Sequence, residues 1–338
     1  MTGRVGPDPY LDWPLDAGDR GREVWYSLVT HQERPIAFWF RYTLLSTADG
    51  HREGRVWAGL TDREDPENGF LRTERHDLDG VDVDTPLHLD YGNAELAPTE
   101  ARGRVTAEDD ANAVFWKFEY EEDDETFTPL RSARLTDVAE RLLGTGRHWS
   151  YNQSIALDGR LEVGPNSYDF EDAEAHQGHT VGRNVPETWS WVNCNGFEED
   201  VVVESLEIEG TNAICLRADG ETYFLNRLHH VKGPFANRSQ ENEPGDWSFV
   251  GKGDGVNVQV SVRVPDDDLW RHAAYLTPDD TVRYVAHCSL SEIEVTYKPD
   301  GEDPTTVEAD SARAEWSATE PPVSGDYAPT EFADRGDD

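Results

Sequence analysis

Residues 159–197 read GRLEVGPNSYDFEDAEAHQGHTVGRNVPETWSWVNCNGF. Residues 160–163 and 189–193 alternate in polarity at period two, which is typical of strands with one buried face. This alternation puts Trp189 and Trp191 on the same face. Residues 169–179, rich in acids and histidines, are expected to form a corner between the two strands. The stretch therefore predicts antiparallel β-structure around either a site for proton chemistry or a solvated hairpin tip.

Strand-like segments extend this pattern over most of the 338 residues. Short aromatic and β-branched runs, separated by turns rich in Asp, Gly and Glu, indicate an all-β fold and are typical of an antiparallel barrel or sandwich. Two successive all-β halves of similar length raise the possibility of tandem related barrels. Apolar positions in residues 132–143 recur at period 3.6 and predict one short linking helix. We expect an extended arm over residues 1–21, β-domains over 22–145 and 146–319, and a disordered acidic tail over 320–338.

The charge of the chain is extreme. It holds 69 Asp and Glu against 30 Lys and Arg, for a formal net charge of −39, and the acids are spread along the whole length. Molar salt shortens the Debye length to roughly 3 Å and screens such repulsion. We therefore interpret the acidity as adaptation to a high-salt cytoplasm and expect the protein to lose its β-structure as salt is withdrawn, which circular dichroism would measure.

Charge and composition also exclude several classes of partner. No basic stripe is present to neutralise phosphates, which argues against nucleic acid and against anionic membranes as partners. No apolar run approaches the ~18 residues of a transmembrane segment, and no secretory signal is visible. Three cysteines far apart indicate neither a disulfide framework nor a zinc site. We expect a cytoplasmic monomer whose partner is a hydrophobic small molecule.

Several short motifs resemble those of one family. In order along the chain they are Glu23, Trp25, Tyr26; Pro98, Thr99, Gly103; His148, Trp149; Tyr168, Phe170, Glu171, Ala173; Gly182, Pro186; and Trp189, Trp191, Cys194, Asn195, Phe197. Over residues 22–316 this order resembles the tocopherol cyclase family and, through it, the tandem lipocalin-like group that includes carotenoid hydratases and AttH-like proteins.

The resemblance implies two lipocalin-like barrels and acid-catalysed chemistry on an isoprenoid alkene inside an aromatic cavity. One departure weakens the second implication. Where the cyclases carry Glu-Lys-Asn-Trp-Gly, residues 178–182 read Gly-His-Thr-Val-Gly. The Lys, Asn and Trp of that core are missing, so the resemblance supports the fold more strongly than the cyclisation reaction.

The candidate site residues follow from these patterns. A desolvated carboxyl with a raised pKa is a suitable proton donor, and a neighbouring imidazole can relay the proton. We expect Glu174, His176 and His179 to act in catalysis, although an acid in so acidic a chain is most often a solvated surface residue. The expected ligand-binding residues are Trp25, Tyr26, Trp149, Tyr168, Trp189, Trp191, Asn193 and Asn195, of which the tryptophans can equally be core residues and the inward-facing asparagine needs a polar partner.

We assign no metal and no cofactor. The alternative is a metal held by the HxxH pair His176 and His179 with Glu174 and with His229 and His230. Three function classes stay open: an enzyme that cyclises, hydrates or isomerises an isoprenoid such as a prenylquinone or carotenoid, a carrier of such a molecule, and a structural protein with filled barrels. Mass spectrometry of lipid extracted from protein purified at high salt would distinguish them best.

Overall fold

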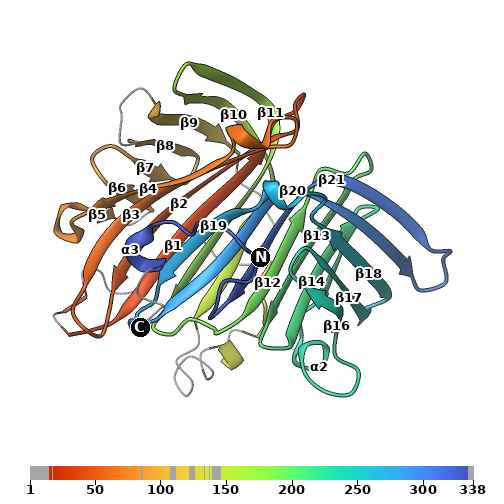
Figure 1. The fold of residues 1–338 in the computed structure, drawn as a ribbon. Helices are drawn as coiled ribbons and strands as arrows, with labels where there is room; N and C mark the ends of the chain where they lie inside the picture. Colours follow the sequence, from red (N-terminus) through yellow and green to blue (C-terminus); the bar gives the residue numbers. More distant parts are fainter. Residues whose placement is uncertain are drawn as a thin grey trace.

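The fold is almost entirely β-structure, as the sequence predicts. The computed structural model describes residues 15–333 except 17, 85–86, 107–111, 122–125, 133, 137 and 139–145. The strands form two curled antiparallel sheets, each folded as a half-barrel (Figure 1). Among the described residues, no helix combines the length and the hydropathy that crossing a bilayer requires.

The first sheet has eleven strands in the order β4-β3-β2-β1-β11-β10-β9-β8-β7-β6-β5. Its elements are β1 Gly21–Thr30, β2 Ile36–Ser46, β3 Arg52–Asp62, η1 Pro66–Asn68, β4 Phe70–His76, η2 Leu78–Gly80, β5 Asp82–Asp84, β6 His88–Asp90, β7 Glu95–Ala97, β8 Glu100–Val105, β9 Val114–Tyr120, β10 Arg147–Val163 and β11 Asn166–Gly182.

The second sheet follows the order β15-β14-β13-β12-β21-β20-β18-β17-β16, with β19 paired to β20. Its elements, with the helices around it, are β12 Trp189–Cys194, β13 Val201–Ile208, β14 Thr211–Ala218, β15 Glu221–Leu225, α2 Leu228–Val231, β16 Arg238–Glu243, β17 Asp246–Gly253, β18 Val256–Arg263, η4 Asp267–Leu269, β19 Arg271–Leu276, β20 Val282–Pro299, β21 Thr305–Ala318 and α3 Thr330–Ala333.

Three apolar clusters hold the two sheets. One lies on the inner face of the first sheet and contains Phe38, Phe40 and Phe118, and a second lies on the inner face of the second sheet and contains Val260 and Cys288. The third lies between the sheets, where β2 and β3 approach β20 (Figure 1). Strands β1 to β3 are therefore buried on both faces, which accounts for their lack of solvent-facing positions.

The change from one sheet to the other falls between Gly182 and Trp189, rather than at the expected joint near residue 145. Strand β10 pairs with β9, and β11 pairs with β1, with Trp25 opposite His179. The long hairpin β10–β11 thus completes the first sheet. Of the expected linking helix over residues 132–143, the described residues Arg134, Leu135, Thr136 and Val138 are helical, and the others, apart from Ser132, lie outside the described part.

Two local expectations are wrong. The corner expected at residues 169–179 is a continuous part of β11, with one irregularity at Asp172, where φ is +49°, and the hairpin turn lies earlier, at Gly164. The tail expected to be disordered packs as far as residue 333. Tyr327 and Phe332 bury their rings against Tyr284 and its neighbours, and apolar burial of this kind orders a chain despite its acidity. Residues 1–14 and 334–338 lie outside the described residues.

Candidate functional site

A cavity of about 650 Å³ opens between the two sheets. We call it the inter-sheet pocket. Side chains that point outward from the first sheet meet those that point outward from the second, because alternation turns every other residue of β1, β2, β12 and β13 into this layer. The apolar part of its wall consists of Val24, Tyr26, Trp39, Val181, Val185, Trp189, Trp191, Leu206 and Ile208.

Four arginines also line this pocket, and Arg147 is the one that is only half-buried. The other three, Arg22, Arg41 and Arg283, come from β1, β2 and β20, and each is more than nine-tenths buried. We call them the buried arginine cluster. The carboxylate nearest to them in the wall, Glu315, accepts a hydrogen bond of 2.5 Å from Trp189 Nε1 and lies 3.4 Å from Nδ1 of His287. The remaining acids of the wall are exposed, so the pocket is basic in its buried part and acidic at its opening; they are Glu187, Glu209 and Asp279.

A polar network adjoins the pocket at His148. His148 Nε2 lies 3.2 Å from Oγ of Ser150, which in turn donates to Oε1 of Glu204. Glu204 is fully buried and also accepts from Nε2 of Gln153 (2.8 Å) and Nε1 of Trp191 (2.9 Å). We call this chain the His148–Ser150–Glu204 relay, and it connects a pocket wall to a buried carboxylate.

The acid of this relay is ionised at neutral pH. Burial alone would raise the pKa of Glu204, but the neighbouring imidazoles His176 and His148 and the bond from Ser150 outweigh burial and lower the pKa to about 2. His176 itself is uncharged at neutral pH, since burial lowers its pKa to about 4. The carboxylate therefore depends on its hydrogen-bond donors, as a buried charge must.

Three predicted ligand-binding residues lie in the pocket wall: Tyr26, Trp189 and Trp191. His176 lies behind them, with its ring centre 5.8 Å from that of Tyr26 and 5.2 Å from that of Trp191. Its Nδ1 is 3.4 Å from the carbonyl oxygen of Gln153, and its buried Nε2 has no hydrogen-bond partner among the described residues.

His179 projects from the opposite face of β11, away from His176. Its ring stacks on Trp25 at 4.8 Å and on Trp149 at 5.2 Å, and its Nε2 lies 2.8 Å from a carboxylate oxygen of Glu23. Burial lowers the pKa of His179 to about 3, so the imidazole is neutral. Tyr168 belongs to the inner cluster of the first sheet. Four predicted residues are thus part of the first sheet's interior and do not line the inter-sheet pocket: Trp25, Trp149, Tyr168 and His179.

Glu174, Asn193 and Asn195 gather instead around the buried guanidinium of Arg313. Arg313 Nη1 donates to Oδ1 of Asn193 (2.9 Å) and of Asn195 (2.5 Å), and Nη2 donates to the backbone carbonyl of Glu174 (2.8 Å). Asn193 is the asparagine that faces inward, and Arg313 supplies its polar partner. Burial raises the pKa of Glu174, and Arg313 opposes that shift. This group joins β11 to β12 and β21 outside the pocket wall.

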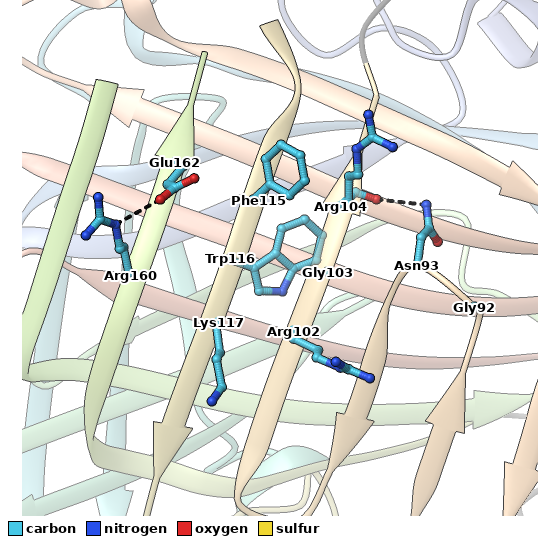
Figure 2. Close-up of a pocket in the computed structure, with 10 residues that line it drawn as sticks. All are labelled: Gly92, Asn93, Arg102, Gly103, Arg104, Phe115, Trp116, Lys117, Arg160 and Glu162. Atoms are coloured by element: carbon cyan, nitrogen blue, oxygen red, sulfur yellow. Dashed lines mark hydrogen bonds and ion pairs between the residues drawn. The ribbon is translucent and has the colours of Figure 1, made fainter. Parts of the chain in front are cut away.

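A second pocket, of about 440 Å³, lies on the outer surface of strands β8 to β10 (Figure 2). Its bases are paired with acids on the same surface: Arg102 with Glu95, and Arg160 with Glu162 at 3.0 Å. Trp116 lies close against Gly103, where any side chain would collide with the indole. The outer-face pocket is thus a shallow crease among compensated charges, unlike the inter-sheet pocket.

The metal alternative gains no support from the arrangement of its ligands. His176 and His179 point to opposite faces of β11, while His229 and His230 lie in α2, beside the second sheet. Within the described part of the chain, no group of three or more His, Cys, Asp or Glu side chains is placed to hold a metal ion.

Sequence reasoning missed the buried arginine cluster and Glu204. A signal for the arginines was present, because Arg41 stands inside the apolar run Phe-Trp-Phe-Arg-Tyr-Thr-Leu and Arg283 inside Val-Arg-Tyr-Val-Ala. A charged residue within a strand otherwise built for burial is unusual and indicates a special environment. Glu204 stands in a similar run, Val-Val-Val-Glu-Ser-Leu, although acids flank that run on both sides.

No protein-family model matches the chain, and no curated protein matches it. Several solved structures are similar to this chain. A Nitrosomonas europaea protein assigned as AttH is 14% identical, with a TM-score of 0.53 over 92% of this chain and 98% of that one. CghA is 10% identical, with a TM-score of 0.53 over 95% of this chain and 97% of that one. The structure of CghA with Sch210972 is also 10% identical, with a TM-score of 0.52 over 90% of each chain. At such identities the similarity shows the fold, a tandem lipocalin-like arrangement of the AttH type.

Proposed function

We propose that the protein binds an apolar small molecule of the isoprenoid class, of prenylquinone or carotenoid type, in the inter-sheet pocket. One observation carries the proposal. Each sheet fills its own inner face with apolar side chains, whereas the layer between the sheets leaves about 650 Å³ open beside Tyr26, Trp39, Trp189 and Trp191. Small-molecule sites have volumes of roughly 300–1,000 Å³ and mostly apolar walls.

Two further points support this reading. An aromatic wall buries much apolar ligand area and stabilises positive charge on a bound molecule. CghA, a protein with a similar fold, has been crystallised with Sch210972. The isoprenoid class comes from the resemblance to tocopherol cyclases.

Tryptophan fluorescence in molar KCl tests the binding. Titration with a prenylquinone or a carotenoid should quench the emission saturably, and Trp189→Ala should weaken the affinity by about 10-fold, since it removes one large contact from the wall. Phe115→Ala, in the outer-face pocket, should leave the affinity unchanged. If no isoprenoid changes the emission at saturating concentration, the pocket has another role and the proposal is lost.

A second candidate function is catalysis of an acid-type cyclisation, hydration or isomerisation in the same pocket. The His148–Ser150–Glu204 relay favours it, because its hydrogen bonds join an imidazole in the pocket wall to a buried carboxylate, the two kinds of group that proton transfer uses. Because Ser150 donates its hydroxyl hydrogen to Glu204, its oxygen accepts from Nε2 of His148, while Nδ1 of His148 lies 3.2 Å from Thr180 Oγ1.

Product analysis after incubation with the bound isoprenoid tests this step. His148→Gln should lower turnover by roughly 10²- to 10⁴-fold, the usual contribution of a general acid or base, and leave ligand affinity nearly unchanged. Recovery of unaltered ligand from the unmodified protein would instead indicate a carrier. Equal turnover in His148→Gln and the unmodified enzyme would exclude the relay from the mechanism.

A further inference from the structure

Arg22 is a buried cation without an ion pair. Its side chain is 8% exposed and lines the inter-sheet pocket. Among the described residues it forms no hydrogen bond and no ion pair, and Glu315, in the same wall, offsets only part of the cost of its burial. Burial and the nearby Arg41 lower its pKa to about 9, so it stays charged at neutral pH. An uncompensated buried charge is costly, and such groups normally have a counter-charge.

The other two members of the buried arginine cluster are only partly satisfied. Arg41 donates from Nε to Thr43 Oγ1 at 3.2 Å, and its guanidinium carbon lies 3.9 Å from the ring centre of Tyr275. Arg283 donates from Nε to the carbonyl oxygen of Pro186 at 2.8 Å and from Nη1 to Thr281 Oγ1 at 3.0 Å. Both are held in place by neutral groups, which anchor their positions without cancelling their charge.

The balance of charge in the buried part of the pocket is therefore positive. Three arginines face one carboxylate, Glu315, which is already engaged by Trp189 and His287. Such a concentration of positive charge is unexpected in a chain of net charge −39. The outer-face pocket provides the contrast, because Arg102 there pairs with Glu95. Arg160 pairs with Glu162, as Figure 2 shows. Arg22 has no such ion pair, so the arginines of the two pockets differ in how their charge is balanced.

We propose that the ligand of the inter-sheet pocket is an anionic amphiphile, with a carboxylate bound by Arg22 within the buried arginine cluster and an apolar body against Trp39, Trp189 and Trp191. The inference rests on the proposed function, of which it specifies the ligand class. A carboxylate suits the planar guanidinium, which can bind both of its oxygens. A single negative charge also suits the site better than the double charge of a phosphate, because Glu315 lies in the same wall.

The preference for an anionic ligand should persist in molar salt. Salt screens exposed charges strongly but buried pairs much less. The exposed acids at the opening, Glu187, Glu209 and Asp279, repel an approaching anion only when the salt is low. Molar salt should therefore speed the entry of an anionic ligand without abolishing its pairing with Arg22.

The test compares two probes that differ in charge and in one methyl group. Retinoic acid and methyl retinoate share one isoprenoid body, and both quench tryptophan emission by energy transfer. In molar KCl we expect the acid to bind about 10-fold more tightly than the ester, a difference of about 1.4 kcal/mol. Arg22→Met should remove this preference by weakening the acid and should keep the ester within about two-fold. Arg102→Met, in the outer-face pocket, is the matched control and should preserve the preference.

A stability measurement separates recognition from a structural role. If Arg22 serves the ligand, its replacement by Met should raise the thermal midpoint of the ligand-free protein, because an unpaired buried charge is lost. A lower midpoint together with weakened ester binding would show a structural role and overturn the inference.

The remaining outcomes are also decisive. Equal affinity for acid and ester overturns the anionic ligand while the proposed pocket stands. Binding of neither retinoid nor any prenylquinone overturns both proposals. Tighter binding of farnesyl monophosphate than of retinoic acid overturns the assignment to a carboxylate.

Discussion

The inner faces of the sheets and the layer between the sheets are built from the same strands, yet their side chains differ. On β2, Phe38, Phe40 and Tyr42 point into the inner cluster of the first sheet, whereas Trp39 and Arg41 point into the inter-sheet layer. The inner faces are closely filled and mostly apolar, with the buried His179–Glu23 pair as an exception in the first sheet. The layer between them holds arginines, histidines, a buried glutamate and a cavity.

This difference separates stability from function within single strands. An apolar inner face gains free energy from every buried side chain. The inter-sheet layer instead buries charged groups such as Arg22 and Glu204, each of which has a desolvation cost. We infer that the half-barrels support the protein and that the layer between them is specialised for a ligand. The predictions below test this division.

The largest effect should come from the inner face of the first sheet. Phe118→Ala removes a fully buried ring and should lower the free energy of unfolding by about 3–5 kcal/mol. Phe115, three positions earlier on β9, is 42% exposed. Phe115→Ala should therefore change the free energy of unfolding by less than about 0.5 kcal/mol. Denaturant titration in molar KCl measures both. Similar losses for the two variants would contradict the orientation of β9.

The next effect should come from the inter-sheet layer as the pH falls. Burial lowers the pKa of His176 from 6.5 to about 4, so between these values the unfolded chain binds a proton that the native protein does not. The stability due to this group is complete above pH 6.5 and is lost as the pH falls towards 4. At 1.36 kcal/mol per pKa unit the loss amounts to about 3 kcal/mol.

Unfolding titrations from pH 4 to 8 measure this loss. His176→Gln should flatten the pH dependence by that amount, and His88→Gln, at a half-buried position on β6, is the comparison variant. If the unfolding free energy of His176→Gln depends on pH as steeply as that of the unmodified protein, the inter-sheet layer is accessible to protons and solvent. That result would contradict the proposed difference between this layer and the inner faces.

Local patterns were sufficient to predict much of the fold. Alternation correctly put Trp189 and Trp191 on one face, and both line the inter-sheet pocket. Alternation cannot show which strands pair, since pairing depends on contacts between distant segments. The hairpin β10–β11 was therefore assigned to the second domain, although its residues Leu157 and Leu161 belong to the first sheet's core.

The candidate site was predicted only in part, for a related physical reason. Sequence proximity suggested that His176 and His179 act together, but an odd separation along a strand sends two side chains to opposite faces. The pocket residues that were missed come from several strands. Arg22, Arg283 and Glu204 are far apart in the chain, and only the packing of one sheet on the other brings them into the same layer.

The smallest effect should come from Glu174, the carboxyl that the sequence favoured as proton donor. It lies beside Gly196 and Ser311, outside the pocket wall. Burial raises its pKa, so its ionised form is disfavoured in the native protein, and the associated stability is lost as the pH rises above its ordinary value of 4.5. Glu174→Gln keeps the shape and removes the charge, while the backbone carbonyl still accepts from Arg313.

We expect Glu174→Gln to change the free energy of unfolding at pH 7 by less than about 1 kcal/mol and ligand affinity by less than about two-fold. His148→Gln serves as the counterpart from the pocket wall in assays of turnover. If Glu174→Gln instead lowers turnover by the roughly 10²-fold or more expected of a general acid, proton chemistry reaches beyond the pocket wall. The residues around Arg313, which join β11 to β12, would then take part in the reaction, because the carboxyl of Glu174 would have to approach the ligand.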